Sequence, residues 1–276
     1  MADAASPFCL LREDCIGKII SLTSPIDACT AAAVSPAFKS AVEYDVVWER
    51  FLPSDYEEIV SGSGLLVELL TKKELYFLMC DTDLIVGGGK MSFRLNRSTG
   101  KKCCMISARE LYIAWKGNPE HWEWISSPES RFGEAAELRS VCWLEIRGTL
   151  RLQILSPNTN YEAFLVFKLS ENSYGLENSK KASIKVVKDN TTKSTEDNIT
   201  TVYIVQPTRT RLPLGIMLRR YPSSRGDCWM EIKLGEFVVE EGDEGDVVIQ
   251  LLETEHLNWK KGLIVQGIEV RPKKLF

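Results

Sequence analysis

Residues 229–234 read Trp-Met-Glu-Ile-Lys-Leu, a stretch in which apolar and charged side chains alternate. Successive side chains of a β-strand point to opposite faces of the sheet. Met230, Ile232 and Leu234 are therefore predicted to face one side, and the glutamate and lysine between them the other. This period of two predicts a β-strand with one apolar and one charged face.

The same kind of pattern recurs around this stretch. Apolar residues of one parity occur at 247–251, and those at 263–265 are followed by a change of parity at Gly267, which predicts a β-bulge. Residues 164–167 are continuously apolar, as in a strand covered on both faces. Many such strands joined by polar turns predict an antiparallel, jelly-roll-like β-sandwich from residue 103 onward.

Several segments have less regular sequences. Residues 57–70 and 72–79 predict helices, and the glycine-rich residues 87–90 predict a turn leading into a strand. Residues 141–155 predict a long strand pair. The polar residues 188–201 predict a mobile surface loop.

Residues 8–53 predict a set of short helices. Asp14 and Asp27 are predicted to cap the first two, a Ser-Pro pair at 35–36 opens the third, and Asp45 opens the last. So few residues do not make a self-sufficient core. Their exposed apolar side chains therefore favour a partner surface.

Composition excludes several classes of protein. The chain has 276 residues, and its 34 Lys and Arg against 38 Asp and Glu give a net charge of −4, whereas a general nucleic-acid binder carries a basic surplus. No apolar run reaches the ~20 residues that span a bilayer, and we expect no secretory signal. The eight cysteines include no Cys-x-x-Cys pair, which predicts reduced thiols in an intracellular protein.

Residues typical of catalysis are few. His121 and His256 are the only histidines, which is too few for a convincing hydrolytic triad or histidine-rich metal site. The acidic residues between Glu236 and Asp246 do not follow the spacing of a calcium loop. We interpret them as a solvated loop or, alternatively, as a carboxylate-lined binding edge. The sequence predicts no catalytic residue, no metal site and no cofactor.

A cluster of aromatic residues is more informative. Trp115, Trp122 and Trp124 lie within ten residues of one another, with His121 beside them and a Gly-Asn-Pro turn at 117–119. Exposed tryptophan rings suit the C–H faces of sugars, and carboxylates accept hydrogen bonds from sugar hydroxyls. Alternatively, some of these rings fill the sandwich core. Of the last two tryptophans, Trp124 is the predicted core member.

Long strings of the sequence resemble two known families. Residues 11–53 resemble a plant F-box. The strings at 107–111, 141–148, 227–237 and 262–268 resemble phloem protein 2, the domain of the tobacco lectin Nictaba. In this order the parts are similar to the phloem protein 2-B group of F-box proteins.

The resemblance implies an α+β multidomain chain. It would consist of a small all-α F-box module at 8–53, a connector at 54–102 and an antiparallel β-sandwich lectin domain at 103–276. Such a protein docks on a Skp-type adaptor, and through it on a cullin, as the non-catalytic receptor subunit of a ubiquitin ligase. It would recognise N-glycans or N-acetylglucosamine oligomers on its targets. We expect it in the cytoplasm and nucleus, without nucleic-acid or membrane partners.

Candidate site residues follow from the same resemblance. The sugar-binding residues of Nictaba-like lectins align with Trp115, Trp122 and Glu236, and a fourth aligns with Asp243, where the lectin has the longer glutamate. Apolar residues of the short helices are predicted to contact the adaptor, although some must form the internal core instead. The predicted adaptor set is Leu11, Ile16, Ile19, Leu22, Val34, Phe38 and Trp48.

Three departures from the family pattern affect these predictions. Arg12 stands where F-boxes usually have proline, which predicts a weaker start of the first helix or weaker adaptor contact. Ile26 replaces a residue that is usually basic in the group. The short carboxylate of Asp243 leaves open the alternative that the sandwich binds a protein rather than a sugar. A hydrolase is disfavoured, because no catalytic carboxylate pair can be singled out.

Overall fold

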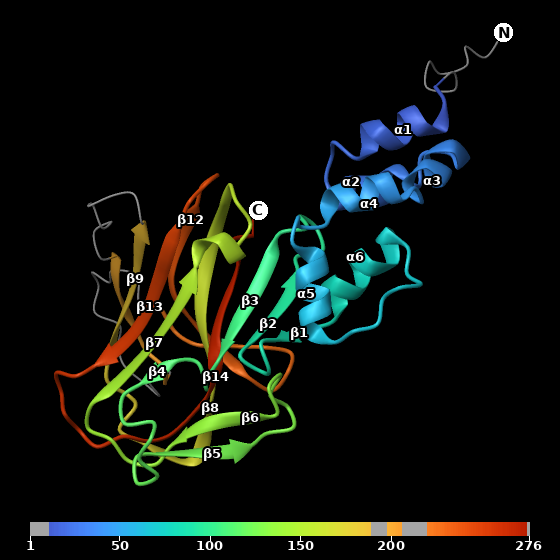
Figure 1. Ribbon diagram of the computed structural model, residues 1–276. Helices are drawn as coiled ribbons and strands as arrows, with labels where there is room; N and C mark the ends of the chain where they lie inside the picture. The colour runs from blue at the N-terminus through green and yellow to red at the C-terminus, as the bar shows by residue number, and fades with distance from the viewer. Residues whose placement is uncertain (1–10, 189–197, 206–219, 275–276) are drawn as a thin grey trace. The chain divides into compact units, whose positions relative to one another are not determined.

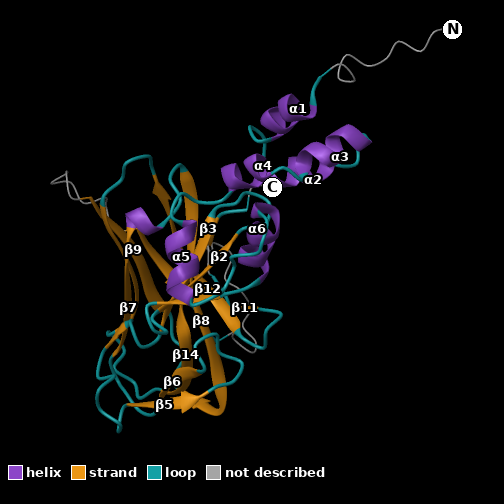
Figure 2. Cartoon of the chain, turned by 45° about the vertical axis from the view of Figure 1, so that its right-hand side comes forward, coloured by secondary structure: helices purple, strands orange, loops and turns teal. Residues whose placement is uncertain are grey.

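The computed structural model describes residues 11–188, 198–205 and 220–274. Helices come first along the described chain and strands follow, as Figures 1 and 2 show. The paired strands described below are antiparallel. This order of helices and antiparallel sheets agrees with the predicted α+β class.

Contacts between residues divide the chain into two compact units. The first, which we call the helical unit, contains the residues up to 86 together with residues 93–102. The second, the β unit, contains residues 87–92 and those from 103 onward. Most of the segment expected to be a connector thus packs with the helices.

Four short helices begin the described part of the helical unit: α1 (Glu13–Ile20), α2 (Pro25–Ala31), α3 (Pro36–Val42) and α4 (Asp45–Phe51). Ser35 caps α3 as predicted, because its side chain accepts a hydrogen bond from the backbone N–H of Phe38. Ser24, not Asp27, caps α2, and Asp27 completes a capping box from the third helical position. Among the described residues no side chain caps α1, so the predicted cap by Asp14 is wrong.

The rest of the helical unit contains α5 (Tyr56–Ser63), α6 (Lys72–Asp81), β1 (Leu84–Val86) and most of β2 (Met91–Leu95). The helix predicted at 57–70 is too long. Gly64 adopts a left-handed φ of 72°, which ends α5 at Ser63. The following residues leave the helix and expose the side chains of Leu66 and Leu69.

Trp48 lies in the core of the helical unit. Its side chain is 0% exposed, and its Nε1 donates a hydrogen bond to the carbonyl oxygen of Val42 at 2.6 Å. The ring centroids of Tyr76 and Phe77 on α6 lie 5.2 and 5.1 Å from that of Trp48. Such aromatic pairs stabilise a core by about 0.5–1.5 kcal/mol each beyond the area they bury. The indole of Trp48 therefore fastens α4 to α6.

The β unit is an antiparallel sandwich. Its strands are β3 (Lys102–Ser107, which starts at the boundary), β4 (Tyr112–Ile113), β5 (Trp122–Ser126), β6 (Glu134–Leu138), β7 (Leu144–Arg151), β8 (Thr159–Tyr174), β9 (Lys180–Lys188), β10 (Asn198–Val202), β11 (Ser223–Ser224), β12 (Met230–Val239), β13 (Gly245–Glu253) and β14 (Lys261–Pro272). Within this unit one sheet has the order β3-β14-β8-β12-β11, with the β5–β6 hairpin attached to β14, and the other has the order β10-β9-β13-β7-β4. A Cβ built on Gly148 of β7 would lie 3.1 Å from Ile268 of β14, so the two sheets pack face to face.

The register of β14 confirms the predicted bulge. The pairing of β14 with β8 shifts between Val265 and Gly267. A Cβ at Gly267 would lie 2.0 Å from the carbonyl oxygen of Ile106 on β3, so the close passage of the two strands requires glycine. Val265 and Ile268 are both fully buried although their spacing is odd. The bulge therefore lets the apolar residues before it and after it face the same core.

Other strand predictions have mixed outcomes. Ile232 and Leu234 lie in the core as the alternation predicts, and residues 164–167 are buried. The strand pair predicted at 141–155 is wrong, because β7 is a single strand followed by a short 3-10 turn. The loop predicted at 188–201 is shortened by β9 and β10, and residues 189–197 lie outside the described residues.

The burial of Trp48 generates a stability prediction. Trp48→Ala should lower the free energy of unfolding of the helical unit by about 3–5 kcal/mol, because it leaves a large cavity. Hydrogen exchange of the α4 amides measures this loss. Val46→Ala, an exposed change on the same helix, should shift it by less than about 0.5 kcal/mol. Equal effects of the two substitutions would contradict the core position of Trp48.

Candidate binding sites

The predicted adaptor residues divide into an exposed and a buried group. The exposed group comprises Leu11, Ile19, Leu22 and Val34, and Phe38 is half-buried. Ile26, which replaces the usual basic residue, is also exposed. These apolar side chains occupy the described surface of the helical unit, and a partner could cover them.

Ile16 and Trp48 do not belong to that surface. Ile16 is 1% exposed, because α1 turns it toward α3 and α4 while Ile19, three residues later, faces solvent. Trp48 is enclosed by the aromatic residues of α6. The prediction that these two side chains contact an adaptor is therefore corrected. Their role is to hold the helices together.

Arg12 has backbone angles that a proline at this position would also adopt. Arg12 precedes α1 with φ −68° and ψ 149°, and a proline ring would hold φ at about −65°. The expected weakness at the start of α1 is therefore not visible in the geometry. What a proline would add is a less flexible unfolded chain.

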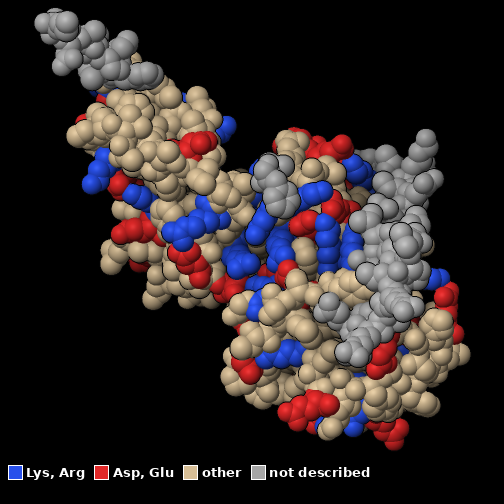
Figure 3. Space-filling view, turned by 180° about the vertical axis from the view of Figure 1, so that it is seen from behind, with Lys and Arg blue, Asp and Glu red and all other residues tan. Residues whose placement is uncertain are grey.

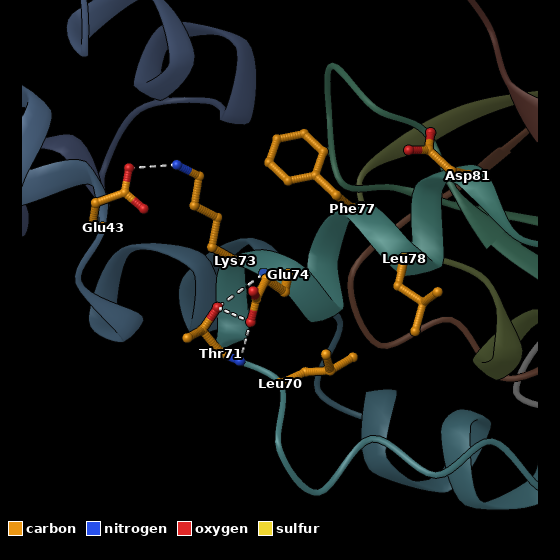
Figure 4. Close-up of a pocket in the computed structure, with 8 residues that line it drawn as sticks. All are labelled: Glu43, Leu70, Thr71, Lys73, Glu74, Phe77, Leu78 and Asp81. Carbon is orange, nitrogen blue, oxygen red and sulfur yellow. Dashed lines mark hydrogen bonds and ion pairs between the residues drawn. The ribbon is translucent and has the colours of Figure 1, made fainter.

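A pocket of about 630 Å³ opens in the helical unit beside α6 (Figure 4). Its apolar side chains are those of Leu70, Phe77 and Leu78, and its charged residues already have partners. Lys73 pairs with Glu43 at 2.6 Å, and Glu74 accepts a hydrogen bond from the hydroxyl of Thr71 at 2.9 Å. The residues around it are Glu43, Leu70, Thr71, Lys73, Glu74, Phe77, Leu78 and Asp81. The recess thus combines three apolar side chains with polar ones that already take part in ion pairs and hydrogen bonds.

The two predicted sugar-binding tryptophans have different environments. Trp115 is 60% exposed, with its ring centroid 5.8 Å from that of His121. Trp122 is 2% exposed, and its Nε1 donates a hydrogen bond to the carbonyl oxygen of Ala114 at 3.1 Å. The prediction that Trp122 stacks on a sugar is therefore corrected, because its ring is part of the core.

Of these two tryptophans, it is Trp124 and not Trp122 whose ring stays partly accessible. It is only partly buried, and the guanidinium of Arg109 lies 3.7 Å from the centre of its ring. Arg109 is held in turn by Glu134 at 2.6 Å. The expectation that Trp124 is the core member of the pair is thus wrong. The β5–β6 hairpin thus buries the ring of Trp122, whereas Arg109, from the segment between β3 and β4, covers one face of Trp124.

The two predicted acidic residues are engaged in ion pairs. Glu236 pairs with Lys233 and Lys273, which both lower the pKa of its carboxyl group, Lys233 more strongly. Asp243 is bound by Lys188 at 2.7 Å. Burial raises the pKa of Asp243, but the hydrogen bonds from Lys188 and from the backbone N–H of Glu240 lower it below its usual value. Acidic and basic side chains also mix on the face drawn in Figure 3.

These acids lie at the opposite end of the β unit from the tryptophans. Asp243 precedes the first residue of β13, whereas Trp115 follows Ala114, whose N–H bonds to Glu145 near the far end of that strand. Nine residues of β13 separate the two ends by about 25–30 Å at ~3.3 Å per residue. Figure 1 shows β5 and β6 at the lower end of the unit. The four predicted residues therefore do not form one site.

Two exposed tryptophans at the Trp115 end escaped the sequence analysis. Trp143 is 44% exposed and directly precedes β7, and Trp259 is 57% exposed and lies two residues before β14. In the structure each lies just before a strand rather than within one, where a large ring is less easily covered. The sequence carried no such signal for Trp143, because residues 141–155 predict a strand pair.

Two buried ammonium groups lie beneath these loops. Lys180 Nζ donates hydrogen bonds to the carbonyl oxygens of Leu176 and Asn178, both at 2.7 Å. Lys260 Nζ forms an ion pair with Glu253. Burial, reinforced by the charge of Lys260, lowers the pKa of Lys180 to about 7.

The described residues contain neither a metal-binding cluster nor a helix that could cross a membrane. No group of three or more His, Cys, Asp or Glu side chains in residues 11–188, 198–205 and 220–274 is placed to hold a metal ion. In the same part of the chain, no helix has the length and apolar character needed to cross a membrane.

A helical unit with an exposed apolar surface and a β-sandwich with exposed aromatic loops define a modular binding protein. A family profile described as Phloem protein 2 matches residues 101–272. The chain is 43% identical to F-box protein At2g02240 of Arabidopsis thaliana, over 99% of this chain and 83% of that protein. It is 42% identical to F-box protein PP2-B10 of the same plant, over 98% of this chain and 96% of that protein. The chain belongs to the phloem protein 2 family, in its PP2-B group of F-box proteins.

Solved structures are much less similar. The CBM22-2 xylan-binding domain from Paenibacillus barcinonensis Xyn10C aligns with a TM-score of 0.33 and 11% identity, over 60% of this chain and 93% of that domain. A likeness at this level carries no conclusion about ligand or mechanism.

The buried Lys180 generates a pH prediction. Because its folded pKa of about 7 lies below the ~10.4 of an unfolded lysine, the unfolded chain binds more protons between these values. Its contribution to the free energy of unfolding should therefore rise with pH, by up to about 1.4 kcal/mol per unit. Lys180→Met should remove this slope.

Denaturant titrations at pH 6.5, 8 and 9.5 measure the slope in the wild type and the variant. The exposed neighbour variant Lys181→Met is the matched control and should keep the wild-type slope. If Lys180→Met and Lys181→Met gave the same pH profile, Lys180 would not titrate in this range.

Proposed function

We propose that this protein is the substrate-recognition subunit of a Skp-cullin-F-box ubiquitin ligase. Its helices would dock on a Skp-type adaptor, and its β-sandwich would recognise a carbohydrate on the target. It contributes no catalytic residue in this proposal and acts in the cytoplasm and nucleus. The F-box names of the relatives support the assignment, and we retain 8–53, 54–102 and 103–276 as proposed boundaries of F-box, connector and lectin domain.

Exposed apolar side chains carry the docking half of the proposal. Leu22 and Val34 are largely exposed, and Leu11, Ile19 and Ile26 add to the same class of surface. Burying one such side chain fully contributes about 1.5–3 kcal/mol. A small helical unit that leaves several of them in water is therefore expected to bind a partner.

The double variant Leu22→Ala/Val34→Ala should weaken adaptor binding at least tenfold, because two apolar contacts are lost. Isothermal titration of the full chain with a purified Skp-type adaptor measures the affinity. Leu69→Ala, also highly exposed in the helical unit but outside the adaptor set, should bind as the wild type does. No complex with wild-type chain at micromolar concentration would refute the docking proposal.

Trp115 carries the carbohydrate half. Its ring is exposed on a loop whose backbone is held in a left-handed conformation, φ 68°, which is uncommon for a non-glycine residue. The strain of that conformation points to a function for the displayed side chain. An indole face next to an imidazole suits an N-acetylglucosamine-containing chain or an N-glycan. A single platform predicts weak binding, on the order of micromolar to millimolar.

Trp115→Ala should lower the affinity for chitotriose at least fivefold, since the stacking face is lost. Asp243→Asn should leave the affinity unchanged, because Asp243 is ion-paired at the other end of the sandwich. A glycan array followed by titration of the positive ligands measures both. Loss of binding in Asp243→Asn with retention in Trp115→Ala would move the site to the acidic end.

A second candidate function is recognition of a protein surface by the same sandwich. The burial of Trp122 and the ion pairing of Glu236 and Asp243 favour it, because they withdraw three of the four residues expected to hold sugar. This candidate predicts no signal on a glycan array. It also predicts a target complex that survives glycosidase treatment.

A further inference from the structure

We propose that Trp143 and Trp259 extend the Trp115 platform, so that the loops at this end of the sandwich bind an uncharged oligosaccharide rather than a single sugar. The inference rests on the proposed carbohydrate recognition and adds two binding residues to it.

Backbone and side-chain hydrogen bonds join the loops to one another. Val141 and Lys260 exchange backbone hydrogen bonds of 3.2 and 2.8 Å, which places Trp143 and Trp259 on neighbouring segments. The backbone oxygen of Ser140 lies 2.8 Å from Nδ1 of His121, the residue whose ring contacts Trp115. The three exposed tryptophans therefore belong to one continuous set of loops.

A third loop is fastened to the same set. Asn258 Nδ2 donates a hydrogen bond to the carbonyl oxygen of Gly175 at 2.9 Å, and Asn178 Nδ2 donates one to Asn258 Oδ1 at 3.1 Å. Gly175 passes so close that a Cβ there would lie 2.0 Å from the carbonyl oxygen of Trp259. The segment that presents Trp259 is thus held on both sides.

The buried ammonium groups support these loops from below. Lys260 Nζ donates hydrogen bonds to the carbonyl oxygens of Cys142 and Asn258 at 2.8 and 2.7 Å, one residue before each exposed tryptophan. Burying a charge is unfavourable unless hydrogen bonds and a counter-ion compensate. Glu253 provides the counter-ion. A polar brace of this kind preorganises Trp143 and Trp259, which lowers the entropy lost on binding.

Backbone strain occurs in the same loops. Trp115 and Leu257 adopt positive φ values of 68° and 35°, and both present exposed apolar side chains. Non-glycine residues in this region are held there by the surrounding structure, and such residues concentrate at binding sites. Strain combined with exposure of large apolar groups favours a ligand that covers them.

The charges at this end indicate an uncharged ligand. Arg147 pairs with Glu145 at 2.8 Å, Lys181 pairs with Glu255 at 2.5 Å, and Arg139 pairs with Glu123. Acidic and basic groups thus neutralise each other among the aromatic rings. A nucleic acid or an anionic membrane would need a basic surplus. Rings separated by paired polar groups match the alternating C–H faces and hydroxyls of a neutral sugar chain.

Titration calorimetry of the full chain with N-acetylglucosamine and with its trimer, chitotriose, tests the inference. Trp259→Ala and Trp143→Ala should each lower the affinity for the trimer at least fivefold and leave that for the monosaccharide unchanged. Trp259→Phe, which keeps an aromatic face, should retain most of the trimer affinity. Ile199→Ala, an exposed apolar change on β10, serves as the control and should bind as the wild type does.

Wild-type affinity for the trimer in both alanine variants would overturn the extended platform and leave the proposed function standing. Equal losses for the trimer and the monosaccharide would also overturn it, because these residues would then belong to the primary subsite. No binding of either sugar by the wild type would overturn the carbohydrate proposal itself. Circular dichroism of each variant confirms that a loss of binding is not a loss of fold.

Discussion

The pairing of β14 with three strands at once is the constraint on which the β unit depends. β3, β8 and β6 all take their register from this strand. A slip of one residue reverses which side chains face the core. The bulge at Gly267 absorbs that slip, so Ile268 and Val270 stay in the core, while Glu269 between them is buried in ion pairs with Arg131 and Arg225. β6 pairs with β14 near the start of β14, at Ile264 and Val265. The position of β14 therefore also sets where the β5–β6 hairpin lies.

The helical unit and the β unit differ in how they distribute apolar side chains between core and surface. The helical unit concentrates its aromatic rings around Trp48 and leaves other apolar residues in water. Those exposed residues add little to the stability of the isolated chain and are available to a partner. The β unit buries its apolar rows between two sheets and uses the loops at one end for display. In each unit, the buried core and the exposed apolar side chains come from different residues of the same short segments.

Buried lysine side chains hold the loops of the β unit in place, although burying their charge is unfavourable for folding. A buried Lys180 whose pKa falls to about 7 opposes folding when it is protonated. Lys260 donates hydrogen bonds to carbonyl groups next to Trp143 and Trp259, and Lys180 donates to carbonyl groups of the adjoining loop at Leu176 and Asn178. An apolar side chain at either position would leave those carbonyl groups without these donors. The arrangement favours a defined loop geometry over maximal stability.

Local sequence determined the strand alternation at 229–234, the bulge at Gly267, the cap at Ser35 and the family of the chain, because each depends on neighbouring residues or on long matching strings. Only the tertiary structure decided which of Trp122 and Trp124 is buried, that Ile16 and Trp48 are internal, and that Glu236 and Asp243 lie far from Trp115. The physical reason is that burial and proximity between distant segments are set by strand register and helix packing. A local pattern says which faces exist, but not which neighbour covers each face.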